Sequence, residues 1–105
     1  MDHTGERFYE AEIYRLKGEL LLQRAVPDVP QAEACFEQAL TVARRQQAKS
    51  LELRAALGLS HLWQRQGKRD AAHELLAEVY GWFTEGFDTA DLQEAKTLLD
   101  ELALS

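Results

Sequence analysis

The residues of this chain that could perform chemistry are few, and their spacing does not form a site. His73 and Glu74 begin the His-Glu-x-x-His pattern of a zinc-binding helix, but Ala77 occupies the position of the second histidine. His61 falls on a different predicted helix and has no third partner. The single cysteine, Cys35, falls on an apolar helix face, where we expect a buried thiol that serves packing. Because the chain also has no phosphate-binding glycine loop, the sequence predicts no enzyme activity, no metal and no cofactor.

The composition is that of an ordinary globular chain with an acidic surface. Of the 105 residues, 46% are hydrophobic and 29% are charged, and the formal net charge is −6. An acidic surface repels phosphate, so nucleic acid and anionic membranes are poor partners. One cysteine cannot form an internal disulfide, and no signal peptide or membrane-spanning run is recognisable, which favours a cytoplasmic location. The length predicts a single domain over 1–105.

The chain has helical apolar spacing along most of its length, so we expect five helices and no strands. The expected helices span 7–25, 30–47, 50–67, 70–83 and 89–103. Pro27 and Pro30 separate the first two, because proline cannot continue a helix. Ser50 is suited to cap the third helix, and Gly67 is suited to end it. The short connections make successive helices antiparallel neighbours.

One pattern occurs twice. A small residue, Gly18 and later Ser60, stands in the middle of an apolar helical stretch, and a second helix with apolar residues at i, i+4 and i+7 follows. These second sets are Ala32, Phe36 and Ala39, then Ala72, Leu76 and Val79. Repeated pairs of this kind are typical of helical solenoids, whose units bury their apolar faces against each other. We expect an all-α, antiparallel helical-hairpin array, with repeats over 7–47 and 50–84 and a C-terminal capping helix over 89–103.

These offsets resemble the tetratricopeptide repeat (TPR) family, in which helix A carries a small residue and helix B an alanine–aromatic–alanine series. The matching positions of the second unit are Leu59, Ser60, Trp63, Gly67 and Ala72. Those of the first unit are Tyr14, Gly18, Leu21, Ala32, Phe36, Ala39 and Leu40. Lys17 departs from the family pattern, which usually has leucine at this position. The repeat is also longer than the usual length of about 34 residues, since Gly18 and Ser60 are 42 positions apart.

Long repeats of this kind are similar to the C-terminal TPR region of large bacterial signalling proteins. In those proteins an adenylate cyclase or DNA-binding domain and an ATPase module precede the array. The stretches that carry this resemblance are GERFYEAEIYRLKGELLL, AKSLELRAALGLSHLW and YGWFTEGFDTADLQEAKTLLDEL. It implies a non-catalytic protein–protein interaction or scaffold module, as the C-terminal regulatory segment of a larger signalling protein.

The resemblance also implies a binding groove, because the A helices of TPR arrays line the concave side. The expected groove residues are Glu12, Arg15, Glu19, Leu22, Arg54, Leu57, His61, Gln64 and Arg65. Three arginines and a histidine would suit an acidic peptide or a C-terminal carboxylate. The known carboxylate clamp of this family uses asparagine, which the chain lacks, and this speaks against a chaperone-tail adaptor. The alternative interpretation is a solvated helix surface, and the partner itself stays unknown.

The first predicted helix has more apolar surface than the second helix alone can cover. Its two apolar rows are Tyr9, Ile13, Leu16 and Leu20, and Tyr14, Gly18, Leu21 and Ala25. An uncovered apolar face usually finds a partner. A second hypothesis is therefore a homodimerisation module that self-associates through Phe8, Tyr9 and Tyr14, with two-fold symmetry.

Overall fold

The structure, a computed structural model, describes residues 4–81 and 90–103, with side chains from residue 10 onward. These residues form five helices joined by short turns, and none of them lies in a strand. The helices are α1 (Thr4–Leu22), α2 (Val29–Arg45), α3 (Lys49–Arg65), α4 (Arg69–Tyr80) and α5 (Ala90–Ala103). The prediction of an all-α chain is confirmed for these residues. None of the helices in them is long and apolar enough to cross a membrane.

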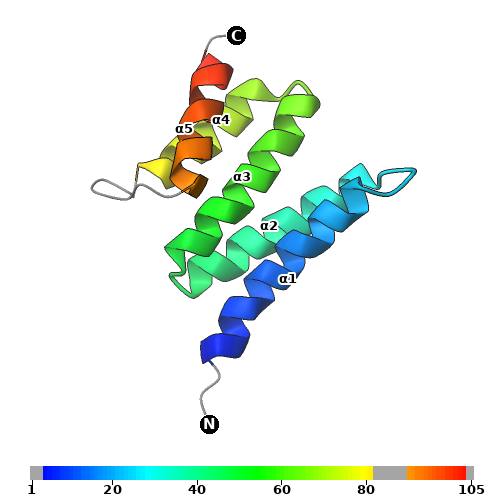
Figure 1. Ribbon diagram of the computed structural model, residues 1–105, viewed down its shortest axis with the longest axis vertical. Helices are drawn as coiled ribbons and strands as arrows, with labels where there is room; N and C mark the ends of the chain where they lie inside the picture. Colours follow the sequence, from blue (N-terminus) through cyan, green and yellow to red (C-terminus); the bar gives the residue numbers. More distant parts are fainter. Residues whose placement is uncertain (1–3, 82–89, 104–105) are drawn as a thin grey trace.

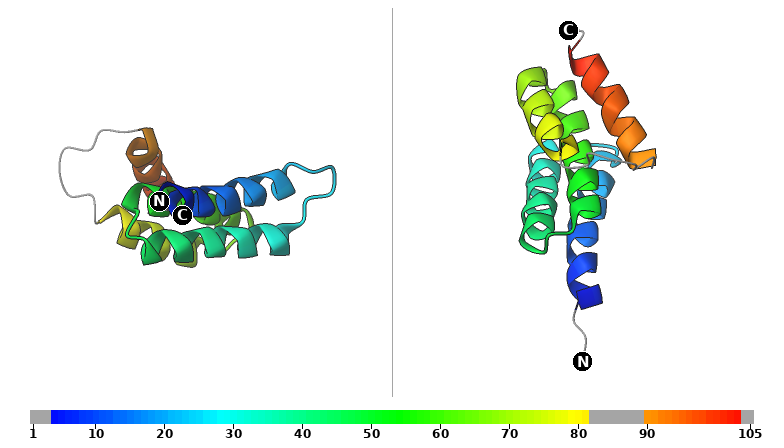
Figure 2. Two further views of the ribbon diagram at one scale, coloured as in Figure 1. Left: turned by 90° about the horizontal axis from the view of Figure 1, so that it is seen from below. Right: turned by 90° about the vertical axis from the view of Figure 1, so that its left-hand side faces the viewer.

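Each helix packs against the next one along the chain, and α3 contacts all four of the others (Figure 1). The helices α2 and α4 lie toward one side of the molecule, and α1 and α5 lie toward the other (Figure 2). Within the described residues the backbones of α2 and α4 do not pack together, and only side chains such as Arg44 and Glu78, 3.7 Å apart, approach each other. In contrast, α3 packs against both α1 and α5. The molecule is flat, with extents of 49 × 40 × 20 Å. The side that carries α1, α3 and α5 therefore forms one continuous helical surface.

The first helix ends three residues earlier than predicted. α1 stops at Leu22, and Ala25 lies exposed in the connection to α2. The chain reverses at once, because the backbone N–H of Gln23 bonds back to Glu19 O and Leu20 O, and that of Asp28 bonds to Leu21 O. Asp28 is the N-cap of α2 and its side chain accepts a hydrogen bond from Gln31 N at 3.3 Å. The turn that leads to Asp28 therefore includes residues 23–25, which the apolar pattern had assigned to the first helix.

The prediction that Ser50 caps the third helix is wrong. The N-cap of α3 is Ala48, which has no side chain to cap with, and Ser50 lies inside the first turn. The cause is the end of α2. The N–H of Ala48 bonds to Ala43 O at 2.9 Å and that of Gln47 to Arg44 O at 3.1 Å, which together form a Schellman turn. Ala48 thus ends this turn and begins α3, so the connection is two residues shorter than a serine cap would require.

The prediction that Gly67 ends the third helix is confirmed. Its φ is +81°, and Lys68 N bonds to Trp63 O at 2.8 Å in a second Schellman turn. At the equivalent point after α2, Gln47 has a φ of 58°, and it is the one non-glycine residue of the described chain with positive φ. The left-handed conformation costs a residue with a side chain about 1–2 kcal/mol, and glycine adopts it freely.

We therefore expect Gln47→Gly to raise the free energy of unfolding by about 1 kcal/mol, because it removes this strain. Urea unfolding followed by circular dichroism measures the change. Gly67→Ala is the matched control, and its effect should have the opposite sign. No atom lies near the added Cβ, so the positive φ alone should lower the free energy of unfolding by about 1 kcal/mol. A loss of stability in Gln47→Gly would contradict the prediction.

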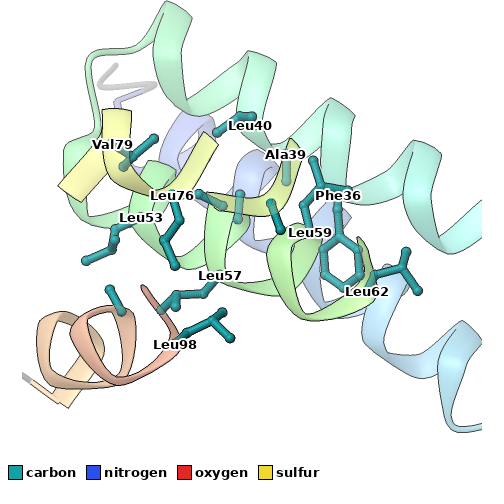
Figure 3. Close-up of a cluster of buried hydrophobic side chains, with 14 of the residues drawn as sticks. Phe36, Ala39, Leu40, Leu53, Leu57, Leu59, Leu62, Leu76, Val79 and Leu98 are labelled. Carbon is teal, nitrogen blue, oxygen red and sulfur yellow. The ribbon is translucent and has the colours of Figure 1, made fainter. Parts of the chain in front are cut away.

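The core centres on the ring of Phe36, which is 1% exposed and points from α2 between α1 and α3. Two glycines make room for it. A Cβ built on Gly18 would lie 3.2 Å from its Cζ, and one on Gly58 would lie 2.6 Å from its Cε1. Figure 3 shows Phe36 beside Leu59 and Leu62 of α3, and all three belong to one buried cluster.

The two predicted small-residue positions occupy equivalent places. Gly18 lies against the carbonyl oxygen of Ala32, 3.2 Å from the position of its missing Cβ. Ser60 is fully buried, and its hydroxyl donates a hydrogen bond to the carbonyl oxygen of Ala72 at 3.4 Å. The two positions are 42 residues apart in the sequence, and their partners Ala32 and Ala72 are 40 residues apart.

Candidate functional site

The predicted groove residues gather where α1, α3 and α5 meet. Glu12, Arg15 and Glu19 face this region from α1, and Arg54 and His61 face it from α3. The third side comes from Asp91 and Glu94 in the first two turns of α5, which sequence reasoning treated only as a cap. We call these seven residues the groove network.

Five members of the groove network form a continuous chain of ion pairs across the three helices. Arg15 donates to Glu12 at 2.8 Å and to Glu19 at 2.7 Å, both within α1. Arg54 of α3 donates to Glu12 at 3.1 Å and to Asp91 of α5 at 3.0 Å. Glu12 thus bridges the two arginines, and Arg54 ties α1 to α5. His61 and Glu94 add a second contact between α3 and α5 at 2.9 Å.

The ion pairs shift the titration of their members. The hydrogen bond from Arg15 lowers the pKa of Glu12, the charges of Arg15 and Arg54 lower it further, and burial opposes them. The pKa of Arg15 is raised, chiefly by its hydrogen bond to Glu12, and that of Arg54 is raised, chiefly by its bond to Asp91. Both guanidinium groups therefore stay charged, and Glu12 stays ionised to lower pH than a free carboxyl group.

Glu12 is expected to stabilise the fold only while it is ionised. Its pKa is lower in the folded than in the unfolded chain, so this stability is fully present above the unfolded value of about 4.3. It is lost as the pH falls through the lowered value. Glu12→Gln should therefore be less stable than the parent at neutral pH, and the difference should shrink at about pH 3.

Urea unfolding at the two pH values tests this expectation. Glu37→Gln is the matched control, because Glu37 is exposed on α2 and makes no ion pair in the described part of the chain. A stability difference between Glu12→Gln and the parent that does not change with pH would contradict it.

Two adjoining cavities open beside the groove network. The larger, of about 420 Å³, has a floor of Leu22, Phe36, Gly58 and Leu62 and a rim of Glu19, Gln23, His61, Arg65 and Glu94. The smaller, of about 300 Å³, is lined by Arg15, Glu19, Arg54, Leu57, Gly58, His61, Asp91 and Glu94. They share Glu19, Gly58, His61 and Glu94, so together they form one groove along α3.

Most of the predicted groove residues lie here, but not all. Gln64 lines neither cavity, and Glu12 takes part through its ion pairs alone. Arg65 lines the larger cavity and forms no ion pair among the residues described. Sequence reasoning missed Asp91 and Glu94. The signal that could have found them is their i, i+3 spacing, which places both carboxylates on one face of a helix that must run parallel to α3.

The residues predicted for self-association are placed only in part. The side chains of Phe8 and Tyr9 lie outside the described residues. Tyr14 is half-buried and packs against both buried clusters of the molecule, so it contributes to the interior. Among the α1 side chains that the structure describes, from residue 10 onward, the exposed large apolar ones are Ile13, Leu16 and Leu20.

The groove contains charged and apolar groups that can bind a ligand. No cluster of three or more His, Cys, Asp or Glu side chains able to hold a metal ion occurs among the described side chains, those of residues 10–81 and 90–103. Cys35 is partly buried and packs against the core. What the geometry provides is an apolar floor framed by fixed charges, which suits non-covalent recognition. Comparisons with protein-family models, with curated proteins and with solved structures find no match.

Proposed function

We propose that this chain is a non-catalytic protein–protein interaction module that holds a peptide segment in the groove between α1, α3 and α5. The observation that carries the proposal is the groove itself, about 420 Å³ in its larger part, with residues from three helices around it. Its size and its apolar floor with a polar rim are those of sites that take a side chain of a ligand.

The arrangement of the helices supports a TPR-like array of two repeats and a final helix. The equivalent contacts of Gly18 with Ala32 and of Ser60 with Ala72 support the repeat. The contacts of α3 with both α1 and α5 are those of a solenoid whose first helices line one side. Such a module serves as a scaffold, and we propose that it acts in the cytoplasm as the C-terminal regulatory segment of a larger bacterial signalling protein.

The charges of the groove favour a ligand with an apolar side chain and basic groups over an acidic one. Around the cavities and the ion-pair chain, four carboxylates face three guanidinium groups. Arg15 and Arg54 are already paired, so an acidic peptide would have to displace Glu12 or Asp91. Removing one partner of such a pair leaves the other unsatisfied, which opposes the exchange.

Panning the full chain against a random 15-residue peptide library displayed on phage tests the proposal. Selected peptides should be apolar and basic, and Glu19→Lys should weaken them at least about tenfold, since it reverses a rim charge. Glu37→Lys, on the exposed face of α2, is the matched control and should leave binding unchanged. If no peptide is enriched, or if both variants bind equally well, the groove is not the binding site. Enrichment of acidic peptides would overturn the charge preference alone.

Self-association is the second candidate function. The observation that favours it is the exposure of Ile13, Leu16 and Leu20 on one face of α1. A homodimer built on this face would sediment at twice the mass of 11.9 kDa, and Leu16→Glu would return it to the monomer. A concentration-independent monomer would rule out this candidate.

A further inference from the structure

The face of α1 that points away from α2 is apolar and uncovered. Ile13 is 61% exposed, Leu16 49% and Leu20 64%, and their i, i+3, i+7 spacing places them on one stripe. They line neither cavity of the groove, so this surface is separate from the proposed peptide site. α1 forms an edge of the molecule, as Figure 1 shows.

The equivalent face of α3, the first helix of the second unit, is covered by α2. With the offset of 42 residues, Ile13, Leu16 and Leu20 correspond to Ala55, Gly58 and Leu62 of α3. Ala55 and Leu62 are 0% and 2% exposed, and Gly58 lies directly against the ring of Phe36. The exposed stripe of α1 therefore corresponds to the buried stripe of α3 that packs against α2.

A charged residue follows the same correspondence. Glu52 of α3 is 2% exposed and accepts a hydrogen bond from Arg44, in the last turn of α2, at 2.7 Å. Its equivalent on α1 is Glu10, which is exposed and has no partner among the described residues. The apolar stripe and the carboxylate at its end thus reproduce the α3 side of the α2–α3 interface, both its apolar and its charged part.

We propose that this face, which we call the α1 face (Glu10, Ile13, Leu16 and Leu20), binds the second helix of a further helical hairpin in the way that α3 binds α2. The chemistry of the face defines this helix. It has an apolar stripe whose central residue is small, because Leu16 fills the space that Gly58 leaves for Phe36. It has an arginine or lysine in its last turn, opposite Glu10. Lys17 of α1 corresponds to the buried Leu59 of α3. The bound helix must therefore leave the ammonium group of Lys17 in water or place a carboxylate near it.

A second copy of this chain fits the α1 face less well. The matching faces of α2 and α4 are already buried in each copy, since Phe36, Ala39 and Leu76 are at most 1% exposed. The exposed side chains of α5 are mainly polar. The remaining match is α1 on α1, where the three apolar side chains by themselves provide only a few hundred Å², below the roughly 800 Å² per partner of a stable interface.

A tandem protein tests the proposal. Residues 4–48 with Phe36→Ala are placed ahead of residues 7–105, so that Ala48 is joined to Arg7, the equivalent of Lys49. The added second helix can then lie on the α1 face as α2 lies on α3. We expect backbone amides of residues 10–20 to exchange with D₂O at least about tenfold more slowly than in the parent chain. Leu16→Glu in the original hairpin should abolish this protection.

Val26→Glu is the matched control, because Val26 is 80% exposed in the connection after α1 and lies off the face. It should keep the protection, and the parent chain should sediment as a monomer. If the amides of residues 10–20 exchange as fast in the tandem protein as in the parent chain, the proposal is wrong. This holds also when the cause is an added hairpin that stays unfolded. A parent chain that forms dimers through these residues, dispersed by Leu16→Glu, would assign the face to a second copy instead.

Discussion

Phe36→Ala is expected to lower the free energy of unfolding by about 3–5 kcal/mol, a large part of the 5–15 kcal/mol typical of a domain. The ring is 1% exposed and lies between α1 and α3, where Gly18 and Gly58 leave room for it. Its removal leaves a cavity that the backbones of two helices would have to close. Chemical denaturation followed by circular dichroism and tryptophan fluorescence measures the loss.

The fit of this ring can be tested from the opposite side. Gly58→Ala places a Cβ 2.6 Å from Cε1 of the ring, so a helix or the ring must shift, and we expect a loss of about 1–3 kcal/mol. In a Phe36→Leu background the same substitution should cost less, because the smaller side chain leaves space for the methyl group. Gly81→Ala is the control, since its φ of −62° suits alanine. An equal cost of Gly58→Ala in both backgrounds would show that the glycine does not serve the ring.

Arg44→Met should cost about 3 kcal/mol, although Arg44 itself is 41% exposed. The reason is the buried one of its two carboxylate partners, since the other, Glu78 at 3.7 Å, is exposed. Glu52 is 2% exposed, and its carboxylate accepts a hydrogen bond from Nε of Arg44 at 2.7 Å. Without the arginine, a buried carboxylate loses this partner and stays shielded from water, which is far less favourable than losing an exposed ion pair.

A double variant separates this cause from lost packing. Glu52→Leu combined with Arg44→Met removes both charges, so it should recover most of the stability that Arg44→Met loses. Arg45→Met, next to it in the last turn of α2 and exposed, is the matched control and should change stability by less than about 0.5 kcal/mol. A double variant no more stable than Arg44→Met would mean that the buried carboxylate is not the source of the loss.

The sequence pattern was sufficient to predict the helices and the buried small residues Gly18 and Ser60. Helical spacing and the glycine after α3 depend on local chemistry, and Gly18 and Ser60 are recognisable because they recur. Gly58 does not recur, since Leu16 stands at its equivalent place. Its role depends on where the ring of Phe36 lies across the interface, which is a property of the packed helices and not of the local sequence.

The charge partners in the groove likewise could not be predicted from the local sequence. The faces of Glu12, Arg15 and Arg54 follow from their helical positions, but their partners do not. Arg54 reaches Asp91, which is 37 residues away, and this contact exists only because α5 packs beside α3. A count of positive charges on two helices therefore suggested an acidic ligand. The carboxylates of the third helix change that balance.

The packing of each helix against its neighbours along the chain has a kinetic consequence. In the described part of the chain, every helix contacts only helices one or two places away, so the loops that close during folding are short and their entropic cost is small. Chains with such a low contact order fold in microseconds to milliseconds. A newly made hairpin of α1 and α2 can form its own contacts before α4 and α5 have been synthesised. The order of synthesis and the order of assembly can therefore coincide, which shortens the time for which apolar helix faces stay uncovered.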